Sequence, residues 1–252
     1  MEIRGTTAVV TGAASGLGAA TATRLAALGA NVIGFDLQAS VDSADPLPGV
    51  TLVAVDVSDA DAVARGLDLA ADQPDPLRIA VNCAGIAPSA RVLSSRGPHD
   101  LGLFSKVVQI NLVGTFTVMT LAAERIAQAE PTDSNLRGVI INTASIAGYE
   151  GQIGQAAYAS SKAGVIGLTI TAARDLAQHG IRVNTIAPGV METPMLATVS
   201  DEYRDALAAG VTFPPRLGRP DEYARLATFL AEHDYMNGEV VRMDGALRMA
   251  PK

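Results

Sequence analysis

Short apolar runs of strand length alternate along the whole chain with longer segments in which apolar residues recur at helical spacing. Some runs, such as Ala8–Val10 and Val139–Ile141, are continuously apolar, as expected where helices cover both faces of a parallel sheet. Strands are predicted at 7–11, 31–36, 51–56, 79–82, 139–143, 182–187 and 239–243. Helices are predicted at 16–28, 59–71, 101–129, 156–178 and 221–232, with Gly29 and Gly180 at C-cap positions.

This alternation is typical of the α/β class. It predicts a single domain, residues 1–252, built as a doubly wound parallel sheet of about seven strands with helices on both faces. The segments 38–48 and 192–220 fit neither a strand nor a helix. Long connections in compact domains are usually functional, and the second segment follows the carboxyl end of a strand, where open α/β sheets bind ligands. Residues 192–220 are therefore expected to form a mobile substrate loop.

Composition and charge exclude several classes of function. The 252 residues include one cysteine, which excludes an intramolecular disulfide, and three histidines without zinc-site spacing. A net charge of −7 argues against nucleic acid or an anionic membrane as the main partner. No apolar run approaches the roughly 20 residues that span a bilayer, and the first predicted strand begins too early for a leader peptide. We therefore expect a cytoplasmic protein without a metal.

A glycine-rich turn, Thr11–Gly18, joins the first predicted strand to the first helix. Glycines at this junction let the backbone approach a pyrophosphate, whose charge faces the unpaired N–H groups of the helix. Asp36 ends the next strand, where a carboxylate binds the adenosine ribose hydroxyls and repels a 2′-phosphate. Neither Ser15 nor Leu37 is a cation that would attract such a phosphate, so NAD is favoured over NADP. Alternatively, Asp36 is a solvated carboxylate at a strand end.

A second acidic residue, Asp56, ends the third predicted strand before Val57. Its carboxylate either reaches the adenine edge or caps the helix that follows. We favour the adenine contact.

Tyr158 and Lys162 lie one helical turn apart on the same face of a predicted helix. An adjacent ammonium is expected to lower the phenol pKa, and Ser145, at the end of the preceding strand, points toward the same cleft. These groups suit interconversion of a carbonyl and an alcohol, in which one group exchanges the proton, one tunes it and one stabilises the oxyanion. Taken singly, a Tyr–Lys pair is usually a surface pair, and such a serine usually caps a helix.

Together these motifs resemble the Rossmann-type short-chain dehydrogenase/reductase family along essentially the whole chain. The matching stretches are Thr11–Gly18, Asn82–Gly85, Asn111, Ser145, Tyr158 with Lys162, and Pro188–Thr193. The resemblance implies that Tyr158 is the acid/base, that Lys162 binds the nicotinamide ribose, that Ser145 holds the substrate oxygen and that Asn111 supports a water in a proton relay. The implied cofactor-binding residues are Gly12, Ser15, Gly16, Leu17, Gly18, Asp36, Asp56, Val57, Asn82, Ala84, Gly85, Tyr158, Lys162, Pro188, Gly189 and Thr193.

Two residues depart from the family pattern. Cys83 replaces the second asparagine of the strand end and is interpreted as a small packed side chain, because nothing nearby suggests a lowered thiol pKa. Ala246 stands where many members have a glycine, so the C-terminal turn is expected to differ.

The second half is similar, more specifically, to the type 2 3-hydroxyacyl-CoA dehydrogenases, a subgroup also described as 17β-hydroxysteroid dehydrogenase type 10. The matching stretches are 137–145, 150–158, 173–177, 213–218 and 237–249. The resemblance implies NAD-dependent interconversion of 3-hydroxyacyl-CoA and 3-oxoacyl-CoA, a step of fatty acid metabolism. Gln152 and Gln155 are candidates to contact the substrate carbonyl or thioester, or else make ordinary loop hydrogen bonds. Candidate cations for coenzyme A are Arg204, Arg216 and Arg219.

Three other functions stay open. They are a dehydrogenase of steroids or other secondary alcohols, a reductase of acyl-carrier-protein substrates, which Asp36 opposes, and a catalytically silent dinucleotide sensor, which the intact catalytic set opposes. The family implies a homotetramer with the helices 101–129 and 156–178 at one interface. Small residues such as Gly164 and Gly167 suit close helix packing either within or between subunits.

Overall fold

The computed structural model of the protein describes residues 1–196 and 200–251. Its centre is a sheet of seven parallel strands in the order β3-β2-β1-β4-β7-β8-β9, so the strand order reverses beside β1 as in a doubly wound fold. The strands are β1 (Thr7–Thr11), β2 (Asn31–Asp36), β3 (Val50–Ala54), β4 (Leu77–Asn82), β7 (Gly138–Thr143), β8 (Ile181–Pro188) and β9 (Val240–Met243).

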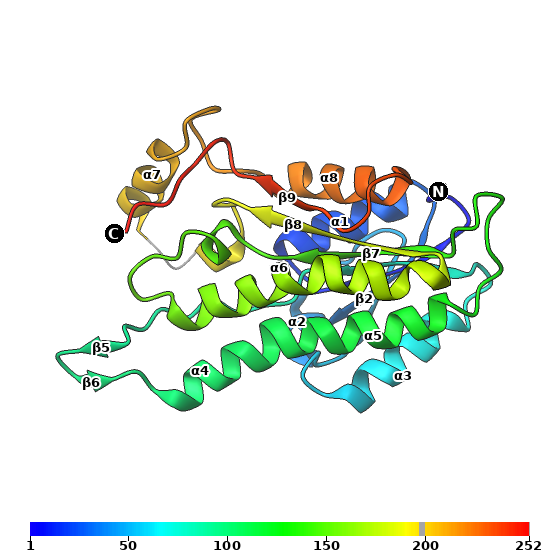
Figure 1. The fold of residues 1–252 in the computed structure, drawn as a ribbon, viewed down its shortest axis with the longest axis horizontal. Helices are drawn as coiled ribbons and strands as arrows, with labels where there is room; N and C mark the ends of the chain where they lie inside the picture. The colour runs from blue at the N-terminus through cyan, green and yellow to red at the C-terminus, as the bar shows by residue number, and fades with distance from the viewer. Residues whose placement is uncertain (197–199, 252) are drawn as a thin grey trace.

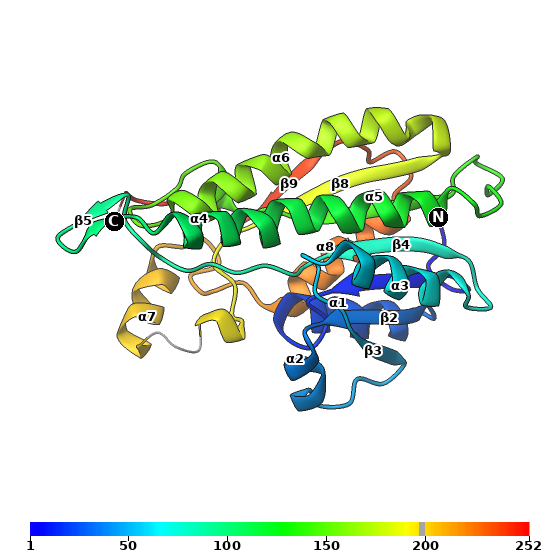
Figure 2. The same ribbon diagram turned by 90° about the horizontal axis from the view of Figure 1, so that it is seen from below.

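Helices cover both faces of the sheet (Figure 1). They are α1 (Gly16–Ala27), α2 (Gln38–Ser43), α3 (Ala60–Ala71), α4 (Leu101–Val108), α5 (Thr115–Ile126), α6 (Ala156–Leu176), α7 (Asp201–Ala209) and α8 (Pro220–Glu232). Helices α1 and α8 pack together on one face, whereas α3, α5 and α6 lie on the other. Seen from below, the rod formed by α4 and α5 runs between α6 and α3 (Figure 2).

The continuously apolar strands are explained by burial on both sides. In β1, Val9 packs into the cluster under α3 and α5, while Ala8 and Val10 pack into the cluster under α1 and α8. Each cluster is completed by helix residues such as Leu67 and Leu25, which are almost inaccessible to solvent. A fully buried aliphatic side chain of this size stabilises the fold by roughly 1.5–3 kcal/mol.

The predicted architecture is confirmed, including all seven strands and the left-handed glycines that follow α1 and α6. Gly29 has φ +94° and Gly180 has φ +68°. The segment 38–48 contains the short helix α2, and 192–220 contains α7, so the second is not one continuous loop. Residues 197–199 within it lie outside the described residues. A two-stranded hairpin, β5 (Leu93–Ser94) and β6 (Gly97–Pro98), also escaped prediction, because two-residue strands have too little apolar pattern to detect.

The prediction of one continuous helix over residues 101–129 is wrong in detail. A π-helical turn, Gln109–Gly114, separates α4 from α5, and the rod ends at Ile126. The rod Leu101–Ile126 is also long and apolar enough, by length and composition alone, to cross a membrane, contrary to the expectation that no run reaches that length. In this fold it lies against α3 and α6, and 28% of its most apolar window is buried.

The carboxyl ends of the strands define one end of the molecule. The β8 and β9 arrows point toward the end that holds α7, the β5–β6 hairpin and the C-terminus (Figure 1). The glycine turn, Asp36, Asn82, Ser145 and Pro188 all lie at or just beyond the carboxyl ends of their strands. The fold therefore brings the predicted functional residues to one edge of the sheet, where open α/β sheets bind ligands.

Candidate active site

The glycine turn brings the backbone of β1 close to the end of β4. Gly12 has φ +66°, and a Cβ added to it would lie 3.0 Å from the Ala84 nitrogen. A Cβ on Gly18 would lie 2.0 Å from the Gly12 carbonyl oxygen, so only glycine lets α1 approach the turn this closely. The Thr11 hydroxyl accepts hydrogen bonds from the Cys83 and Ala84 N–H groups at 3.0 Å each, which ties the turn to the strand end of β4.

The amino end of α1 fits an anionic ligand. Its N-cap, Ser15, has extended backbone, and among the described residues no side-chain hydrogen bond caps the helix and no acidic residue occupies its first turn. The N–H groups of the first helical turn have no partner within the helix and, together with the helix dipole, favour negative charge at this point. The turn is therefore suited to the pyrophosphate of a dinucleotide.

Asp36 lies where the prediction requires it, next to the glycine turn. Its carboxylate accepts a hydrogen bond from the Ala14 N–H at 2.9 Å and from the Leu37 N–H at 2.8 Å. The side chain is only partly buried, so oxygen lone pairs remain available to a ribose hydroxyl. The backbone thus holds the carboxylate in place at the adenosine side of the turn.

Asp56 does not cap the following helix, which was the alternative to an adenine contact. Asp59 does so instead, accepting from the Asp61 and Ala62 N–H groups. One oxygen of the exposed Asp56 carboxylate accepts from the Ser58 N–H at 2.9 Å and from the Ser58 hydroxyl at 2.7 Å. The neighbouring Val57 is buried against Gly114, so its side chain helps to fix the rod rather than lining open space.

Ser145, Tyr158 and Lys162 come together beyond the end of β7. Ser145 is 8% exposed and begins a short 3-10 turn, with its oxygen accepting from the Ala147 N–H at 3.1 Å. The Ser145 side chain lies close enough to the Tyr158 hydroxyl to lower its pKa. Lys162 is 4% exposed, and its Nζ lies 5.8 Å from the centre of the Tyr158 ring. A serine that holds an oxygen beside a phenol and a buried ammonium can bind and protonate a carbonyl oxygen.

The expectation that the pKa of Tyr158 is lowered is wrong. Burial raises the pKa of Tyr158 above its usual value, and Ser145 offsets this only in part. The Lys162 ammonium donates to the Thr143 carbonyl at 2.7 Å instead, and burial lowers the pKa of Lys162 to about 8. Near neutral pH the phenol is protonated and the lysine charged.

Asn111 occupies the π-helical turn and is fully buried. Its amide donates to the Ile86 carbonyl at 2.8 Å and to the Ser161 hydroxyl at 3.1 Å, and its oxygen accepts from the Ile86 N–H at 2.8 Å. A Cβ on Gly85 would lie 3.1 Å from the Asn111 oxygen and 3.6 Å from the Lys162 Nζ. Gly85 thus keeps open the space that Asn111 and Lys162 share. π-helical turns within helices are frequent at functional sites.

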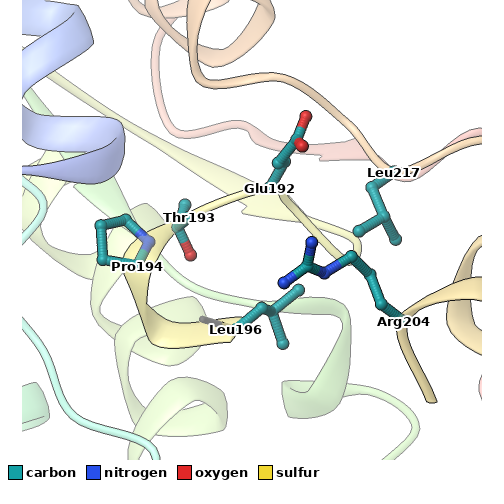
Figure 3. Close-up of a pocket in the computed structure, with 6 residues that line it drawn as sticks. All are labelled: Glu192, Thr193, Pro194, Leu196, Arg204 and Leu217. Atoms are coloured by element: carbon teal, nitrogen blue, oxygen red, sulfur yellow. The ribbon is translucent and has the colours of Figure 1, made fainter. Parts of the chain in front are cut away.

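Residues after β8 face the glycine turn from the opposite side. Thr193 and Pro194 lie beside Gly16, whose added Cβ would be 3.5 Å from each. Gly189 packs closely on Asp244, which fixes the Pro188–Gly189 backbone against the turn after β9. A cavity of about 310 Å³ adjoins this segment and is lined by Glu192, Thr193, Pro194, Leu196, Arg204 and Leu217. Figure 3 shows the Arg204 guanidinium extending toward Leu196 within this cavity.

The two glutamines proposed to contact substrate are engaged within the protein. The side-chain oxygen of Gln155 accepts a hydrogen bond from the main-chain N–H of Gln152 at 3.1 Å. The side-chain amide of Gln152 donates to the Ala250 carbonyl at 2.9 Å. These are the loop hydrogen bonds that were the alternative interpretation, and they join the loop before α6 to the C-terminal segment.

Two of the candidate cations for coenzyme A, Arg216 and Arg219, form ion pairs with residues of α8. Arg216 forms a two-point ion pair with Glu222, with both N–O distances 2.8 Å, and Arg219 lies 3.4 Å from Asp221. Only Arg204, of the three candidates, lines the cavity.

Sequence reasoning missed a buried polar cluster behind the site. Asn82 donates to Asn142 across the strand ends at 2.9 Å, and the Asn82 amide oxygen is buried without a hydrogen-bond partner among the described residues. The hydroxyl groups of Thr143 and Tyr223 form a hydrogen bond of 2.6 Å, and the Cys83 sulfur lies 3.7 Å from each of these hydroxyl oxygens. Burial raises the pKa of the Cys83 thiol, in agreement with its interpretation as a packed side chain. Tyr223 lies in a predicted helix, but nothing in the sequence showed which strand it faces.

Known proteins resemble this chain over its whole length. Residues 12–247 match the family model described as "Enoyl-(Acyl carrier protein) reductase". The 3-hydroxyacyl-CoA dehydrogenase type-2 of Drosophila melanogaster is 48% identical over 254 residues, covering 99% of this chain and 100% of the relative. The enzyme of the same name from Bos taurus is 46% identical over 255 residues, covering 99% and 98%. The crystal structure of 3-hydroxyacyl-CoA dehydrogenase type-2 from Mycobacterium avium matches with a TM-score of 0.91 and 47% identity, over 98% of each chain.

The fold, the site and these similarities define an oxidoreductase that acts on CH–OH groups and uses a nicotinamide dinucleotide. The chain belongs to the short-chain dehydrogenase/reductase family, as the ordered motifs of its sequence predicted.

Proposed function

We propose that the protein interconverts 3-hydroxyacyl-CoA and 3-oxoacyl-CoA with NAD as the hydride carrier. The observation that carries this proposal is the grouping of Ser145, Tyr158 and the buried Lys162 beyond the end of β7, in a chain whose full-length relatives are named 3-hydroxyacyl-CoA dehydrogenase type-2. When bound, the nicotinamide accepts or donates the hydride. The protein's own residues hold the substrate oxygen and move its proton.

Each catalytic residue has a separate task in this proposal. Ser145 donates a hydrogen bond to the substrate oxygen, and Tyr158 exchanges a proton with it. Because burial raises the pKa of Tyr158, the protonated phenol is ready to donate in the direction of ketone reduction. Lys162 supplies positive charge beside the nicotinamide ribose. Asn111 lines the space at Gly85 that it shares with Lys162. Oxidation of the alcohol needs the phenolate and is favoured at higher pH.

NAD is preferred to NADP in this proposal because of Asp36. Its carboxylate is fixed at the turn by two N–H groups and would face a 2′-phosphate with charge of the same sign. Gly12, Ser15, Gly16, Leu17 and Gly18 are assigned to the pyrophosphate. The remaining assigned contacts are Asp56 and Val57 at the adenine, Asn82, Ala84, Gly85, Pro188 and Gly189 along the cofactor, and Thr193 at the nicotinamide amide.

A homotetramer in the cytoplasm completes the proposal. Gly164 of α6 packs on Leu112 within the subunit, whereas Gly167 faces open space and leaves room for a second helix. Leu101 and Phe116 on the neighbouring rod are 78% and 48% exposed, which is the apolar surface that a partner subunit would cover. Size-exclusion chromatography with light scattering measures the assembly directly, and a monomer would contradict this part of the proposal.

Substrate identity is tested by steady-state rates on three compounds at equal concentrations. We expect acetoacetyl-CoA to be reduced with the highest kcat/KM. A 3-ketosteroid that is reduced faster would establish the secondary-alcohol alternative, since an apolar cleft discriminates weakly between hydrocarbon shapes. Reduction of crotonyl-CoA in place of acetoacetyl-CoA would make the protein an enoyl reductase. Binding of NADH without turnover of any compound would favour the dinucleotide sensor.

A further inference from the structure

The carboxyl end of β7 carries a hydrogen-bonded pair that the proposed mechanism does not use. The Thr143 hydroxyl donates to the Asn82 carbonyl on β4 at 2.5 Å. The Tyr223 hydroxyl, which comes from α8, lies 2.6 Å from the same threonine oxygen. Because a threonine hydroxyl has one proton and gives it to Asn82, Tyr223 is the donor in the second bond. Thr143 is therefore fixed from a neighbouring strand and from a helix on the face of the sheet.

The main chain of the same residue holds the catalytic ammonium. Lys162 donates from Nζ to the Thr143 carbonyl at 2.7 Å. Tyr223 is 0% exposed and Thr143 is 7% exposed, so solvent has little access to replace either hydroxyl contact. A shift of the Thr143 main chain moves the carbonyl on which the ammonium rests. It also moves the start of the turn that carries Ser145, two residues further along the chain.

We propose that Thr143 and Tyr223 are positioning residues, whose hydroxyl pair sets the place of the Lys162 ammonium through the Thr143 carbonyl. The catalytic consequence rests on the proposed function, but the state of Lys162 can be measured without substrate. The alternative is that the pair merely attaches α8 to the sheet, in which case its loss lowers stability and leaves Lys162 unchanged.

The groups facing Lys162 are few, which makes its titration easy to interpret. Tyr158 lies on the same helix, and Cys83 approaches from the end of β4. Burial lowers the pKa of Lys162, and the Cys83 thiol partly offsets this. The Thr143 carbonyl stabilises the protonated form by accepting its hydrogen bond. A displaced carbonyl therefore lowers the pKa of Lys162 further.

The structure offers a matched control in the same sheet. Thr169 of α6 and Thr185 of β8 form a buried hydroxyl–hydroxyl hydrogen bond of the same length, 2.6 Å. Both residues are fully buried. This pair joins a helix to a strand, as Thr143 and Tyr223 do, but it does not involve the carbonyl that holds Lys162. Thr185→Val thus measures what the loss of a buried hydroxyl pair costs in stability alone.

The test is an NMR titration of isotope-labelled lysine side chains in the full-length protein, which has only three lysines, Lys106, Lys162 and Lys252. We expect Tyr223→Phe and Thr143→Val to lower the pKa of Lys162 by about half a unit or more, because a weaker hydrogen bond no longer favours the charged form. Thr143→Ser keeps the hydroxyl and is expected to retain the wild-type value, as is Thr185→Val.

Kinetics provide the second arm. We expect Tyr223→Phe and Thr143→Val to lower kcat by about three- to tenfold, the worth of one displaced hydrogen bond, with little change in KM. The upper pH limit of reduction should fall together with the pKa of Lys162. Unchanged Lys162 titration in both variants, with stability losses like that of Thr185→Val, would overturn the proposal. If the wild-type protein shows no turnover, the proposed function is contradicted. The NMR titration of Lys162 still decides whether Thr143 and Tyr223 position the ammonium.

Should Tyr223→Phe fail to fold, the comparison of Thr143→Val with Thr143→Ser carries the same test. Thr143→Val keeps the methyl group of the threonine and loses its hydroxyl, whereas Thr143→Ser keeps the hydroxyl and loses the methyl group. Only the valine is expected to shift the pKa of Lys162. Equal titration of Lys162 in the two variants would contradict the proposal.

Discussion

The two halves of the site are built differently, although they lie along one sheet edge. At the adenosine end, backbone N–H groups provide most of the contacts, and the carboxylate assigned to the ribose, Asp36, is partly exposed and held by main-chain donors. At the carbonyl end, the side chains themselves are buried, and burial shifts the pKa values of Tyr158 and Lys162. The first half therefore selects its ligand by the sign of a charge, whereas the second depends on protonation.

The largest effect is expected from removing the proton donor at the carbonyl end. Tyr158→Phe deletes the hydroxyl beside Ser145 and should lower kcat by about 10²–10⁴-fold, the usual worth of general acid–base catalysis. NADH binding, measured by fluorescence titration, should stay near the wild-type value. Tyr149→Phe, on the half-exposed tyrosine outside the cluster, is the control and should keep its turnover. A wild-type kcat in Tyr158→Phe would contradict the proposed role of Tyr158 as the proton donor.

At the adenosine end, reversing the local charge should change the coenzyme and not the chemistry. Asp36→Ser combined with Leu37→Arg is expected to shift the ratio of kcat/KM for NADH over NADPH about 10–100-fold toward NADPH, because a repelled phosphate gains a charged hydrogen-bond partner. Asp42→Asn, on the exposed face of α2, is a control that should leave the ratio unchanged. An unaltered ratio in the double variant would show that Asp36 does not contact the ribose.

Burial of Lys162 should cost the protein stability, unlike the exposed Lys106. The folded-state pKa, about 8, lies below the value of an unfolded lysine, so the unfolded chain binds more protons between these pH values. Lys162→Met should therefore raise the free energy of unfolding at pH 7 by about 1–2 kcal/mol while abolishing turnover. The gain should shrink as pH rises from 8 to 10, when wild-type Lys162 becomes neutral.

Urea denaturation at pH 7 and pH 10 checks this sign. Lys106→Met, on an exposed side chain, is the matched control and should change stability little at either pH. A gain for Lys162→Met that grows with pH, or a loss at pH 7, would show that the ammonium is not desolvated.

The pH profile should distinguish the two directions of the reaction. Reduction needs a protonated Tyr158 and a charged Lys162, so its rate should fall by about tenfold per pH unit once the pH exceeds the pKa of Lys162, about 8. Oxidation needs the phenolate and should have its optimum at a higher pH. Initial rates in both directions from pH 6 to pH 10 measure this difference. Coinciding optima would contradict the assigned protonation states.

The smallest effect is expected at the turn after β9. Ala246 has φ +63°, a left-handed conformation that disfavours a side chain, and its N–H is held by the Asp244 carboxylate at 3.0 Å. Ala246→Gly should stabilise the fold by about 0.5–1 kcal/mol in urea denaturation. Ala177→Gly, at φ −56°, is the matched control and should lose stability. Equal losses in both variants would mean that the turn is not strained.

Sequence patterns predicted much of this, because the elements that carry them are long and periodic. The seven strands, the glycine turn and Asp36 follow from local patterns, and the parallel fold then places their ends together. The π-helical turn at Asn111 could not be predicted, since it depends on hydrogen bonds to Ile86 and Ser161. Nor could the raised pKa of Tyr158, because helical spacing reports which residues are neighbours but not how deeply they are buried.

The central claim is that hydride passes between the nicotinamide and C3 of the acyl group while Tyr158 handles the proton on oxygen. Its most direct test is reduction of acetoacetyl-CoA with NADH deuterated at both C4 positions, followed by mass spectrometry of the product. The account predicts 3-hydroxybutyryl-CoA with one deuterium at C3. A product without deuterium, or with deuterium at C2, would contradict it.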